Sequence, residues 1–507
     1  MARWYPQVNF AEERKKRHPY HLITLSQKER LLIPRQTMPM QDPIIRRQNF
    51  HEVALGFTLD LAIQEANRCL QCEHPKCVEG CPVGVPIPQF IDAIRRGDIA
   101  AAVAIMKTKN NLPAICGRVC PQELQCEAKC VRAKKGEPVA IGRLERFVGD
   151  FELTHRTCPL ERKPLTGKKV AVVGTGPAGL TCAIDVAREG HDVVMFESLH
   201  VPGGVLVYGI PEFRLPKHVV QSEIEYAVEC LGIEIRTNHV IGRTFTLHDL
   251  LREYDAVFLG TGAGLPMFLN IPGVNLNGVM SANEFLTRVN LMKGYLFPEY
   301  DTPVKVGRKV CVIGGGNVAM DAARCALRLQ TIMAKQTNTD PGEVHIVYRR
   351  SRQELPARAE EVHHAEEEGV IFTLLSTPVE ILGDSEGNVR ALKCIKMKLS
   401  EPDASGRRRP EPIPGSEFEI EADMVIFALG TSPNPLVFMD TPELERTERG
   451  TVKMKDEEKC RTVVSRVWAG GDVVTGAATV VSAMGAGKRA AKDINEYLAT
   501  QSSECQQ

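Results

Sequence analysis

Eight cysteines between residues 69 and 130 form the densest group of reactive side chains in the sequence. They fall into two sets of four, each with a Cys-Pro step: Cys69, Cys72, Cys77 and Cys81, followed by Cys116, Cys120, Cys126 and Cys130. In a cytosolic protein such clustering favours metal ligation, because reducing thiol pools keep disulfides open. The two sets predict ligands for two [4Fe-4S] clusters, although the spacing departs from the simple ferredoxin run.

Structural zinc is the competing interpretation of these cysteines. A zinc site usually uses two CxxC-like pairs held well apart, whereas Cys69 and Cys72 form the one such pair in this sequence. The cysteines outside the two sets are isolated, and we expect most of them to be small buried apolar residues. Because no redox-active cysteine pair accompanies the nucleotide-binding motifs of the chain, exchange with a protein disulfide is disfavoured.

A second chemical pattern runs from Lys169 to Glu197. An apolar run leads into a turn that contains Gly174, Gly176 and Gly179, followed by an apolar-periodic segment and a second apolar run that ends at Glu197. This order predicts a strand, a pyrophosphate-binding turn, a helix and a second strand. Glu197 falls where a carboxylate can accept a hydrogen bond from a ribose hydroxyl. A glycine-rich loop that only packs a helix is the alternative.

The same arrangement recurs later in the chain. Its expected elements are a strand over 309–313, a phosphate turn over 314–319, a helix over 320–329 and a strand over 343–348. Where the first pattern has Glu197, the second has Arg349 and then Arg350. Guanidinium groups clamp a 2′-phosphate that a carboxylate would repel, so the second site should prefer NADP(H). The alternative is that these arginines pair with nearby acids, namely Glu354, Glu360 or Glu361.

Several further segments are expected to complete the two nucleotide-binding units. The glycine- and proline-rich residues 202–216 can lie against a cofactor, with an ordinary surface loop as the alternative. Residues 255–262 and 421–430 have the pattern of the strands that close the first and second unit. After Val467 the chain returns to the first unit, where Asp472 suits a flavin ribityl hydroxyl. The helix that begins near Ala478 would stabilise negative charge on a reduced flavin ring.

The predicted fold class is α/β, with two Rossmann-like, glutathione-reductase-like dinucleotide-binding domains preceded by an α-helical domain that binds two [4Fe-4S] clusters. Helix starts at Thr58, Pro88 and Asp98 place the cysteines on that helical domain. The expected divisions are an extended N-terminal arm 1–45, the iron–sulfur domain 46–165, a first FAD-binding part 166–275, an NADP(H)-binding domain 276–430, a second FAD-binding part 431–500 and a tail 501–507.

Composition limits the classes of partner. The 63 basic and 63 acidic residues balance, which removes any general case for nucleic acid or an anionic membrane. No apolar run approaches the length of a membrane span, and the N-terminus lacks a signal-peptide pattern, so we expect a cytoplasmic protein. His363 and His364 are adjacent and do not share a helix face, so we expect surface histidines rather than a metal site.

Together these motifs resemble the small-subunit family of NADPH-dependent glutamate synthase, which includes the N-terminal half of dihydropyrimidine dehydrogenase. The segments that carry the resemblance are RCLQCEHPKCVEGCPV, CGRVCPQELQCEAKC, VVGTGPAGL, YGIPEFRLPK, VIGGGNVAMD, VYRRSRQELPA, ALGTSPNP and WAGGDVVTGAATVVSAM. The stretch MPMQDPIIRRQNFHEVALGFT looks most like the large subunit of NADH-dependent reduced ferredoxin:NADP oxidoreductase, an electron-bifurcating transhydrogenase.

The resemblance implies FAD in the first nucleotide domain, NADPH in the second and two [4Fe-4S] clusters in the helical domain. It also implies that cluster ligation crosses between the two sets of cysteines, whereas grouping by sequence would keep each set of four together. On the implied pattern, one cluster has Cys69, Cys72, Cys77 and Cys130, and the other has Cys81, Cys120, Cys126 and Glu145. Cys116 would then be spare.

The site prediction follows from these motifs. The expected FAD contacts are Gly174, Gly176, Pro177, Ala178, Gly179, Glu197, Gly204, Leu206, Arg214, Gly262, Gly471, Asp472, Thr479 and Val480. The expected NADP contacts are Gly314, Gly316, Asn317, Val318, Ala319, Arg349 and Arg350. No catalytic acid or base is assigned, because hydride transfer to FAD mainly requires stacking geometry.

The resemblance implies a subunit that moves electrons between NADP(H), FAD, the clusters and ferredoxin. The expected partners are small flavoprotein or iron–sulfur subunits, with FAD bifurcating the electrons. One alternative is the NADPH-oxidising subunit of a glutamate synthase or a dihydropyrimidine dehydrogenase. The other, from a different class, is a non-catalytic scaffold that binds zinc and a nucleotide.

Overall fold

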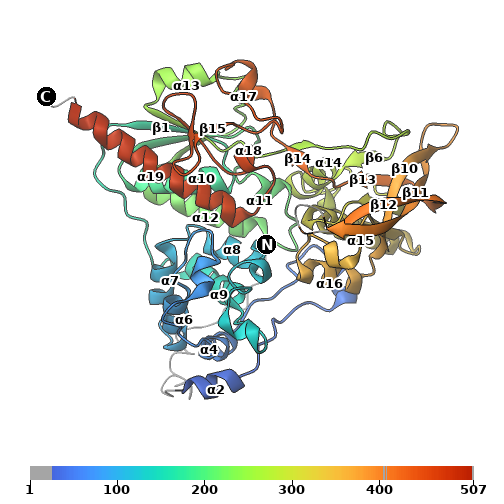
Figure 1. Ribbon diagram of the computed structural model, residues 1–507, viewed down its shortest axis with the longest axis horizontal. Coiled ribbons are helices and arrows are strands. Elements are labelled where there is room, and N and C mark those ends of the chain that lie inside the picture. Colours follow the sequence, from blue (N-terminus) through green and yellow to red (C-terminus); the bar gives the residue numbers. More distant parts are fainter. Residues whose placement is uncertain (1–24, 403–405, 407, 505–507) are drawn as a thin grey trace. The chain divides into compact units, whose positions relative to one another are not determined.

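The computed structural model describes residues 25–402, 406 and 408–504, and these residues belong to two compact units. The helical unit comprises the described residues up to Pro39 together with Leu55–Pro159. The α/β unit comprises Met40–Ala54 and Leu160 onward. The expected arm 1–45 is therefore divided: its first 24 residues lie outside the described part, and the rest is shared between the units. Figure 1 shows the elements of both units.

The helical unit consists of short helices joined by cysteine-bearing loops. Its α-helices are α2 (Gln27–Leu32), α4 (Leu59–Asn67), α5 (Lys76–Glu79), α6 (Ile87–Arg95), α7 (Ile99–Lys107), α8 (Pro113–Val119) and α9 (Ile141–His155). Two 3₁₀ turns, η2 (Gln122–Leu124) and η3 (Val131–Lys134), precede α9. Thr58 and Asp98 cap α4 and α7 through their side-chain oxygens, as the sequence predicts.

Close packing of α8 on α9 depends on glycine. A Cβ atom on Gly117 would lie 2.3 Å from the backbone nitrogen of Arg146, and one on Gly149 would lie 2.4 Å from that of Ala114. Neither helix could keep this distance with a larger residue, because the obstructing atoms belong to the backbone. The contact fixes α9, which carries Glu145, against the helix that leads to Cys120.

The first sheet of the α/β unit has seven strands in the order β15-β16-β17-β4-β1-β2-β3. The strands are β1 (Lys169–Val173), β2 (Asp192–Phe196), β3 (Glu234–Arg236), β4 (Ala256–Leu259), β15 (Met454–Asp456), β16 (Arg461–Thr462) and β17 (Val467–Ala469). Strands β17, β4, β1, β2 and β3 are parallel to one another, and β15 and β16 extend the edge antiparallel. The strand β17 shows that the C-terminal segment completes this sheet.

Helices cover this first sheet, and two that are distant in sequence lie side by side. They are α10 (Pro177–Arg188), α11 (Val205–Tyr208), α12 (Lys217–Leu231), α13 (Leu247–Glu253), α17 (Leu436–Met439), α18 (Asp472–Thr475) and α19 (Val480–Glu504). The long C-terminal helix α19 packs along α10 in Figure 1. Gly487 permits this approach, since a Cβ there would lie 2.3 Å from the carbonyl oxygen of Ala178.

The second sheet repeats the parallel pattern in the order β6-β13-β7-β8-β9. Its strands are β6 (Val279–Ser281), β7 (Lys309–Ile313), β8 (Glu343–Tyr348), β9 (Ile371–Leu374) and β13 (Met424–Phe427). The helical elements around it are α3 (Pro43–Arg46), α14 (Ala282–Leu286), the π-helix η4 (Thr287–Leu291), η5 (Gly294–Leu296), α15 (Asn317–Thr337), η6 (Arg352–Glu354) and α16 (Ala359–Glu368). The helix expected over 320–329 is thus longer at both ends, because its apolar face continues to Ala334.

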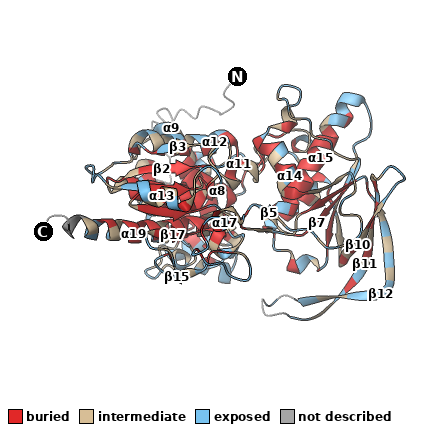
Figure 2. Cartoon of the chain, turned by 90° about the horizontal axis from the view of Figure 1, so that it is seen from above, coloured by how far each residue is buried: buried red, intermediate tan, exposed pale blue. Residues whose placement is uncertain are grey.

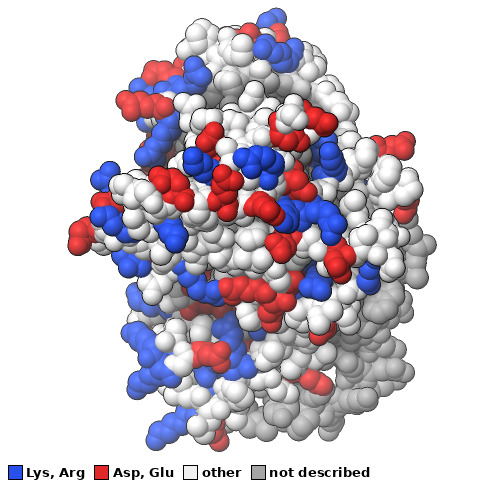
Figure 3. Space-filling model, turned by 90° about the vertical axis from the view of Figure 1, so that its right-hand side faces the viewer, with Lys and Arg blue, Asp and Glu red and all other residues white. Residues whose placement is uncertain are grey.

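A third sheet and a short connection complete the α/β unit. The antiparallel strands β10 (Ser376–Gly383), β11 (Val389–Pro402) and β12 (Arg408–Glu421) form a hairpin extension whose outer face is mostly exposed, as Figure 2 shows. The strands β5 (Leu265–Pro266) and β14 (Thr431–Ser432) pair where the chain passes between the first and second sheets. On the face in Figure 3, basic and acidic side chains are interspersed.

Candidate cofactor sites

Four cysteines of the helical unit line one hollow: Cys69, Cys72, Cys77 and Cys130. Cys69 and Cys72 follow α4, Cys77 lies on α5, and Cys130 immediately precedes η3. Apolar side chains, among them Ile87, Ile91, Val139 and Ile141, form much of the remaining wall. The structure therefore places Cys130 with three cysteines of the first set rather than with its own sequence neighbours.

The thiols of this hollow have the properties of ligands that need a metal. Burial and the neighbouring cysteines raise the pKa of Cys77 to about 12, and burial raises the pKa of Cys69 to about 11. Without a cationic centre these thiols would stay protonated, whereas coordination to iron removes the proton. Among the described residues no three His, Cys, Asp or Glu side chains are close enough to share one metal ion. The four thiols surround a hollow instead, as the cage of a [4Fe-4S] cluster requires.

A second group of ligand-type side chains lies around Glu145. Burial raises the pKa of its carboxyl group to about 7, and Oε1 accepts a 2.7 Å hydrogen bond from Asn110 Nδ2. Burial is the largest cause that raises the pKa values of Cys81 and Cys126, and the charge of Glu145 raises both further. In Cys126 the contribution of Glu127 is larger than that of Glu145. Glu145 and these two cysteines therefore lie near one another, and Cys120 contributes to both cysteine shifts.

Cys116 lies beside this second group and is completely buried. Hydrogen bonds with Cys120 and Asn110 lower its pKa, while burial and Glu145 raise it, and the net direction is upward. Five candidate side chains thus gather where a cluster needs four ligands. The structure itself leaves a choice between Cys116 and Glu145, and the family resemblance favours Glu145.

The first glycine turn is shaped for a pyrophosphate. Gly174 has φ +97°, and a Cβ on Gly179 would lie 1.9 Å from the carbonyl oxygen of Gly174. A Cβ on Gly176, in contrast, would meet no atom within 4 Å. The helix α10 begins at Pro177 without a side-chain cap, so its first N–H groups and positive dipole end face this open space.

Glu197 at the end of β2 is almost fully buried and already has four donors. Its carboxylate accepts from the backbone and hydroxyl of Thr175, from the Leu199 backbone at 2.9 Å and from Ser198 Oγ at 3.2 Å. A carboxylate has about four lone-pair positions. A ribose hydroxyl would therefore replace Ser198, the weakest of these donors. Glu197 also has a role that its motif does not predict, because it braces the glycine turn through Thr175.

Residues from two further segments lie around the first turn. A Cβ on Gly204 would lie 3.0 Å from the Cα atom of Gly176, and one on Gly471 would lie 3.0 Å from the Ala178 side chain. Burial raises the pKa of Tyr208 to about 12, with smaller contributions from Asp472 and Glu197, so these side chains share one region. The remaining FAD positions stay predictions: Leu206, Gly262, Thr479 and Val480.

Lys217 holds together the loop that covers this turn. The loop, residues 203–217, folds back so that Lys217 Nζ donates to the carbonyl oxygens of Leu206 at 3.1 Å, Leu215 at 3.0 Å and Ile210. Burial lowers the pKa of Lys217 to about 8. From the π-helix, Asn290 Nδ2 adds 3.3 Å hydrogen bonds to the carbonyl oxygens of Tyr208 and Gly209. The 203–217 loop is therefore an ordered wall rather than a surface loop.

Arg214 of this loop makes contacts that its prediction as an FAD contact did not include. Its buried guanidinium contacts both oxygens of Asp321 on α15 at 2.6 and 2.7 Å, and Glu361 on α16 at 3.1 Å. Arg214 thereby connects the loop to the helices of the second sheet, and its FAD contact stays a prediction. The sequence gives no signal for this pair, because Asp321 follows 107 residues later.

The second glycine turn has the same open shape. Gly314 has φ +143°, and a Cβ on Gly316 would meet no atom within 4 Å. The helix α15 begins at Asn317 without a side-chain cap, and Val318 on its first turn is 43% exposed. Ala319, in contrast, faces the core. Backbone N–H groups and an apolar side chain thus face the space that a dinucleotide would occupy.

The two arginines after β8 lie in different environments. Arg349 is exposed, whereas Arg350 is 6% exposed and its Nε donates to the Arg408 carbonyl oxygen at 2.8 Å. The acids that could have paired with them have other partners: Glu354 contacts Arg408, Glu360 contacts Arg358, and Glu361 contacts Arg214 and Arg324. Arg349 is therefore the better placed of the two for a 2′-phosphate.

Two nucleotide cradles in one α/β unit and a cysteine-lined helical unit define a class, the iron–sulfur flavin oxidoreductases that use a pyridine nucleotide. The models of two protein families match the chain: dihydropyrimidine dehydrogenase domain II, 4Fe-4S cluster, over residues 46–157, and pyridine nucleotide-disulphide oxidoreductase over residues 168–487. The chain belongs to the pyridine nucleotide-disulphide oxidoreductases, in the group that resembles the glutamate synthase small chain. The predicted fold class is confirmed, and the family implies FAD, NADP and 4Fe-4S clusters.

Three similar proteins illustrate this family. The chain is 37% identical to the small chain of NADPH glutamate synthase from Halomonas elongata, over 89% of this chain and 94% of that protein. It is 40% identical to the NADP(+)-dependent formate dehydrogenase subunit beta of Moorella thermoacetica, over 83% of this chain but 60% of that protein. The structure of Mycobacterium tuberculosis FprA in complex with NADPH matches 68% of this chain and 86% of that chain, with a TM-score of 0.53 and 22% identity, which shows the shared fold.

Two other expectations can be compared with the structure. His363 is exposed as expected, but His364 is buried, and its Nε2 lies 3.2 Å from the sulfur of Met40. The expectation of a surface position was wrong for His364, because the inner face of α16 is covered by residues near Met40. None of the helices in the described ranges combines the length and apolar character needed to cross a bilayer.

Proposed function

We propose that this chain is the NADPH-linked electron-transfer subunit of a multi-subunit oxidoreductase. NADPH binds the second cradle, FAD binds the first, and two [4Fe-4S] clusters occupy the helical unit. The observation that carries the proposal is the pair of open glycine turns in one unit, each at the uncapped start of a long helix. The names of two relatives support the nucleotide, since one is an NADPH glutamate synthase chain and the other an NADP(+)-dependent dehydrogenase subunit.

The residues of this chain bind and orient, and the cofactors supply the redox chemistry. When bound, FAD accepts a hydride from NADPH and releases its two electrons singly to iron–sulfur clusters. Backbone N–H groups of the two turns hold the pyrophosphates, and Arg349 clamps the 2′-phosphate of NADPH. Cys69, Cys72, Cys77 and Cys130 hold one cluster, while Cys81, Cys120, Cys126 and Glu145 hold the other.

We further propose that the electrons divide between ferredoxin, reached through the clusters, and a partner flavoprotein subunit. The support is the resemblance of residues 38–58 to the bifurcating transhydrogenase family. A second candidate is the NADPH-oxidising subunit of a glutamate synthase, which the match over 94% of the Halomonas chain favours. Copurification separates the two: a large amidotransferase partner supports the second, and a small flavoprotein with ferredoxin-reducing activity supports the first.

Anaerobic purification and metal analysis test the common part of the proposal. The expected sample shows flavin absorption with a broad iron–sulfur shoulder, about eight iron atoms per chain, and bleaching of the flavin band on addition of NADPH. Cys72→Ala should lower the iron content to about four, while Cys116→Ser, changed at a buried cysteine outside the proposed ligand sets, should keep all of it. A colourless wild-type protein that contains zinc would support the scaffold alternative and overturn the enzyme.

A further inference from the structure

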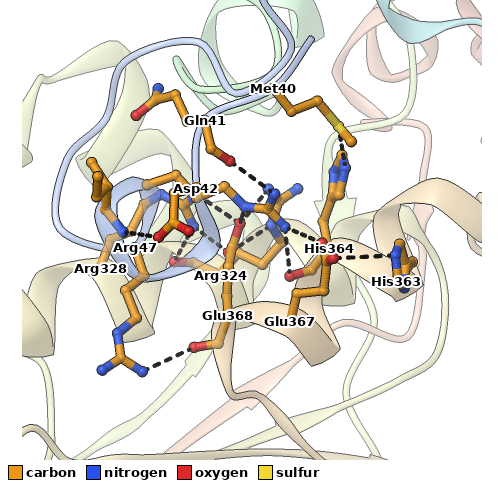
Figure 4. A network of polar contacts seen from close by, with 12 residues as sticks. Met40, Gln41, Asp42, Arg47, Arg324, Arg328, His363, His364, Glu367 and Glu368 are labelled. Carbon is orange, nitrogen blue, oxygen red and sulfur yellow. Dashed lines mark hydrogen bonds and ion pairs between the residues drawn. The ribbon is translucent and has the colours of Figure 1, made fainter. Parts of the chain in front are cut away.

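Residues 40–54, which we call the strap, lie in sequence between two parts of the helical unit, yet they belong to the α/β unit. The strap carries the short helix α3, and the last residue of this helix, Arg46, is buried. Arg46 Nη2 lies 2.7 Å from Glu367, and Nε lies 2.8 Å from Glu368. Figure 4 shows the surroundings of these contacts, with Glu367 and Glu368 of α16 close to Gln41 and Asp42 of the strap.

Glu368 is the centre of a buried ionic network. Its two oxygens accept five hydrogen bonds, of 2.6 to 3.0 Å, from Arg46, Arg324 and Arg328. Burial alone would raise the pKa of Glu368, but Arg324 and Arg328 hold it well below the usual range. Arg328 also donates to the carbonyl oxygen of Asn49 on the strap at 3.1 Å. The carboxylate therefore joins α16, α15 and the strap.

The same network reaches the 203–217 loop. The guanidinium carbons of Arg328 and Arg324 lie 3.8 and 4.6 Å from the centre of the Phe213 ring. The strap contacts this residue as well, since the Val53 N–H donates to the Phe213 carbonyl oxygen at 2.9 Å. Phe213 is buried in the core of the second sheet together with Phe50 and Val53 of the strap. One loop residue thus lies between the strap and α15.

The buried network contains equal numbers of basic and acidic side chains. Four arginines face four acids: Arg46, Arg214, Arg324 and Arg328, with Asp321, Glu361, Glu367 and Glu368. Buried ion pairs add little net stability, because desolvation offsets their attraction. Separating one partner is nevertheless strongly destabilising, since it leaves a buried charge uncompensated. The network therefore resists displacement of any one of its elements.

We propose that the strap is a positioning element for hydride transfer, with Arg46 and Glu368 as its positioning residues. It holds the second-sheet helices and the 203–217 loop in one arrangement, so that the nicotinamide bound by one domain meets the flavin bound by the other. The inference rests on the proposed function. Hydride transfer moves one hydrogen nucleus with two electrons from NADPH to FAD and leaves NADP⁺, and it requires reacting atoms about 3–3.5 Å apart. Domains of this kind move relative to each other unless an interface fixes them.

Arg46→Met tests the strap, because methionine fills the space but forms no ion pair. Arg47→Met is the matched control: this neighbouring arginine is only partly buried, and its Nη1 makes a 3.4 Å bond to the Glu368 carbonyl oxygen. Three measurements on the holoenzyme separate positioning from binding. They are NADP⁺ affinity by calorimetry, the anaerobic stopped-flow rate of flavin reduction at saturating NADPH, and hydrogen exchange in α16 and the 203–217 loop.

For Arg46→Met we expect an NADP⁺ affinity within about twofold of wild type and a rate of flavin reduction lower by roughly 10- to 100-fold. Hydrogen exchange should rise in both α16 and the loop, and Arg47→Met should resemble wild type in all three measurements. An Arg46→Met protein with wild-type rate and exchange would overturn the strap. If that variant purifies poorly, Glu367→Gln should show the same changes at smaller size, because this carboxylate is 31% exposed. A Glu367→Gln protein without these changes would overturn the positioning role of the strap.

The proposed function and the strap fail differently. If the wild-type flavin is not reduced by NADPH, the proposed function is wrong, and hydrogen exchange still reports whether Arg46 fixes the loop. If wild type is reduced and Arg46→Met is reduced equally fast, the function stands and the positioning role is wrong.

Discussion

The two nucleotide cradles share a strand, a glycine turn and a helix, but they differ in the charged residue at the end of the second strand. After β2 stands the buried carboxylate of Glu197, which accepts four hydrogen bonds and braces its own turn. After β8 stands the exposed guanidinium of Arg349. The acid of the first cradle is therefore held in place by its own turn, as suits a permanently bound cofactor. The second leaves its charged group in solvent, as suits a nucleotide that binds and leaves.

The cradles also differ in how they are covered. The 203–217 loop lies over the first turn, where Gly204 approaches Gly176, and Lys217 fixes the loop through three carbonyl oxygens. At the second turn Val318, on the first turn of α15, is exposed, although a Cβ on Gly176 or on Gly316 would meet open space in both cradles. The two turns share one local motif, but the segments packed around them differ. We therefore expect a bound nucleotide to leave the second cradle more easily than the first.

The largest expected effect comes from the tightest backbone contact of the first cradle. Gly179→Ala would place a Cβ 1.9 Å from the Gly174 carbonyl oxygen. We expect a loss of about 3 kcal/mol or more in unfolding free energy, together with loss of FAD. Gly176→Ala, with open space at its Cβ, should keep the apoprotein stable while weakening FAD. Thermal unfolding and flavin content check both variants, and equal stability losses would contradict this distinction.

Lys217, which fixes the 203–217 loop over the first cradle, predicts that stability depends on pH. Burial lowers the pKa of Lys217 from 10.5 to about 8, so the folded protein loses this proton at lower pH than the unfolded chain does. Between these two values the unfolded state binds more protons, and stability should rise with pH by at most about 3 kcal/mol. Below pH 8 Lys217 stays protonated in the folded protein, and the full cost of burying its charge remains. Urea midpoints at pH 8 and 9.5 should differ more in wild type than in Lys217→Met, and parallel shifts would refute the effect.

Removal of the exposed arginine should alter nucleotide choice. Arg349→Ala should weaken NADPH by about 2 kcal/mol, because a charged hydrogen bond to the 2′-phosphate is lost, and leave NADH nearly unchanged. Arg350→Ala is the matched comparison, and its effect should be smaller because the Nε of Arg350 already donates to the backbone at residue 408. Dissociation constants for both nucleotides provide the test. Equal losses for NADPH and NADH would refute the clamp.

The smallest expected effect concerns the carboxylate of the first cradle. Glu197→Gln keeps the shape of the side chain but weakens the hydrogen bonds that Thr175 and Leu199 donate. We expect a loss of about 1 kcal/mol in FAD affinity, with the fold retained. Flavin release during dialysis measures this change. An unchanged affinity would mean that Glu197 serves the turn alone.

Local motifs were predictable where the requirement lies in the backbone. The strands β1 and β7 and both glycine turns occur where the sequence places them, because tight turns need glycine wherever the fold occurs. The N-cap residues Thr58 and Asp98 were equally predictable, since capping depends on neighbours within three residues. Element identity and the order of cofactor motifs therefore followed from short-range chemistry.

Long-range pairs were not predictable from the residues alone. Sequence grouping assigned Cys130 to the second set of cysteines, but it lines the hollow with Cys69. The ion pair of Arg214 with Asp321, 107 residues away, had no signal in the sequence. His364 was expected on the surface, but Met40 covers it. In each case the partner is distant in the chain.

By itself the sequence determined the two dinucleotide motifs, the metal-binding character of the cysteines and the charge that distinguishes the second cradle from the first. These depend on residue type and spacing within one turn or one strand. Only the tertiary structure decided which cysteines share a hollow, which acid neutralises which arginine, and that residues 40–54 fasten α16 to the loop over the first cradle. The reason is physical: buried charges and packed rings must find partners through space, and their cost depends on burial, which no local pattern specifies.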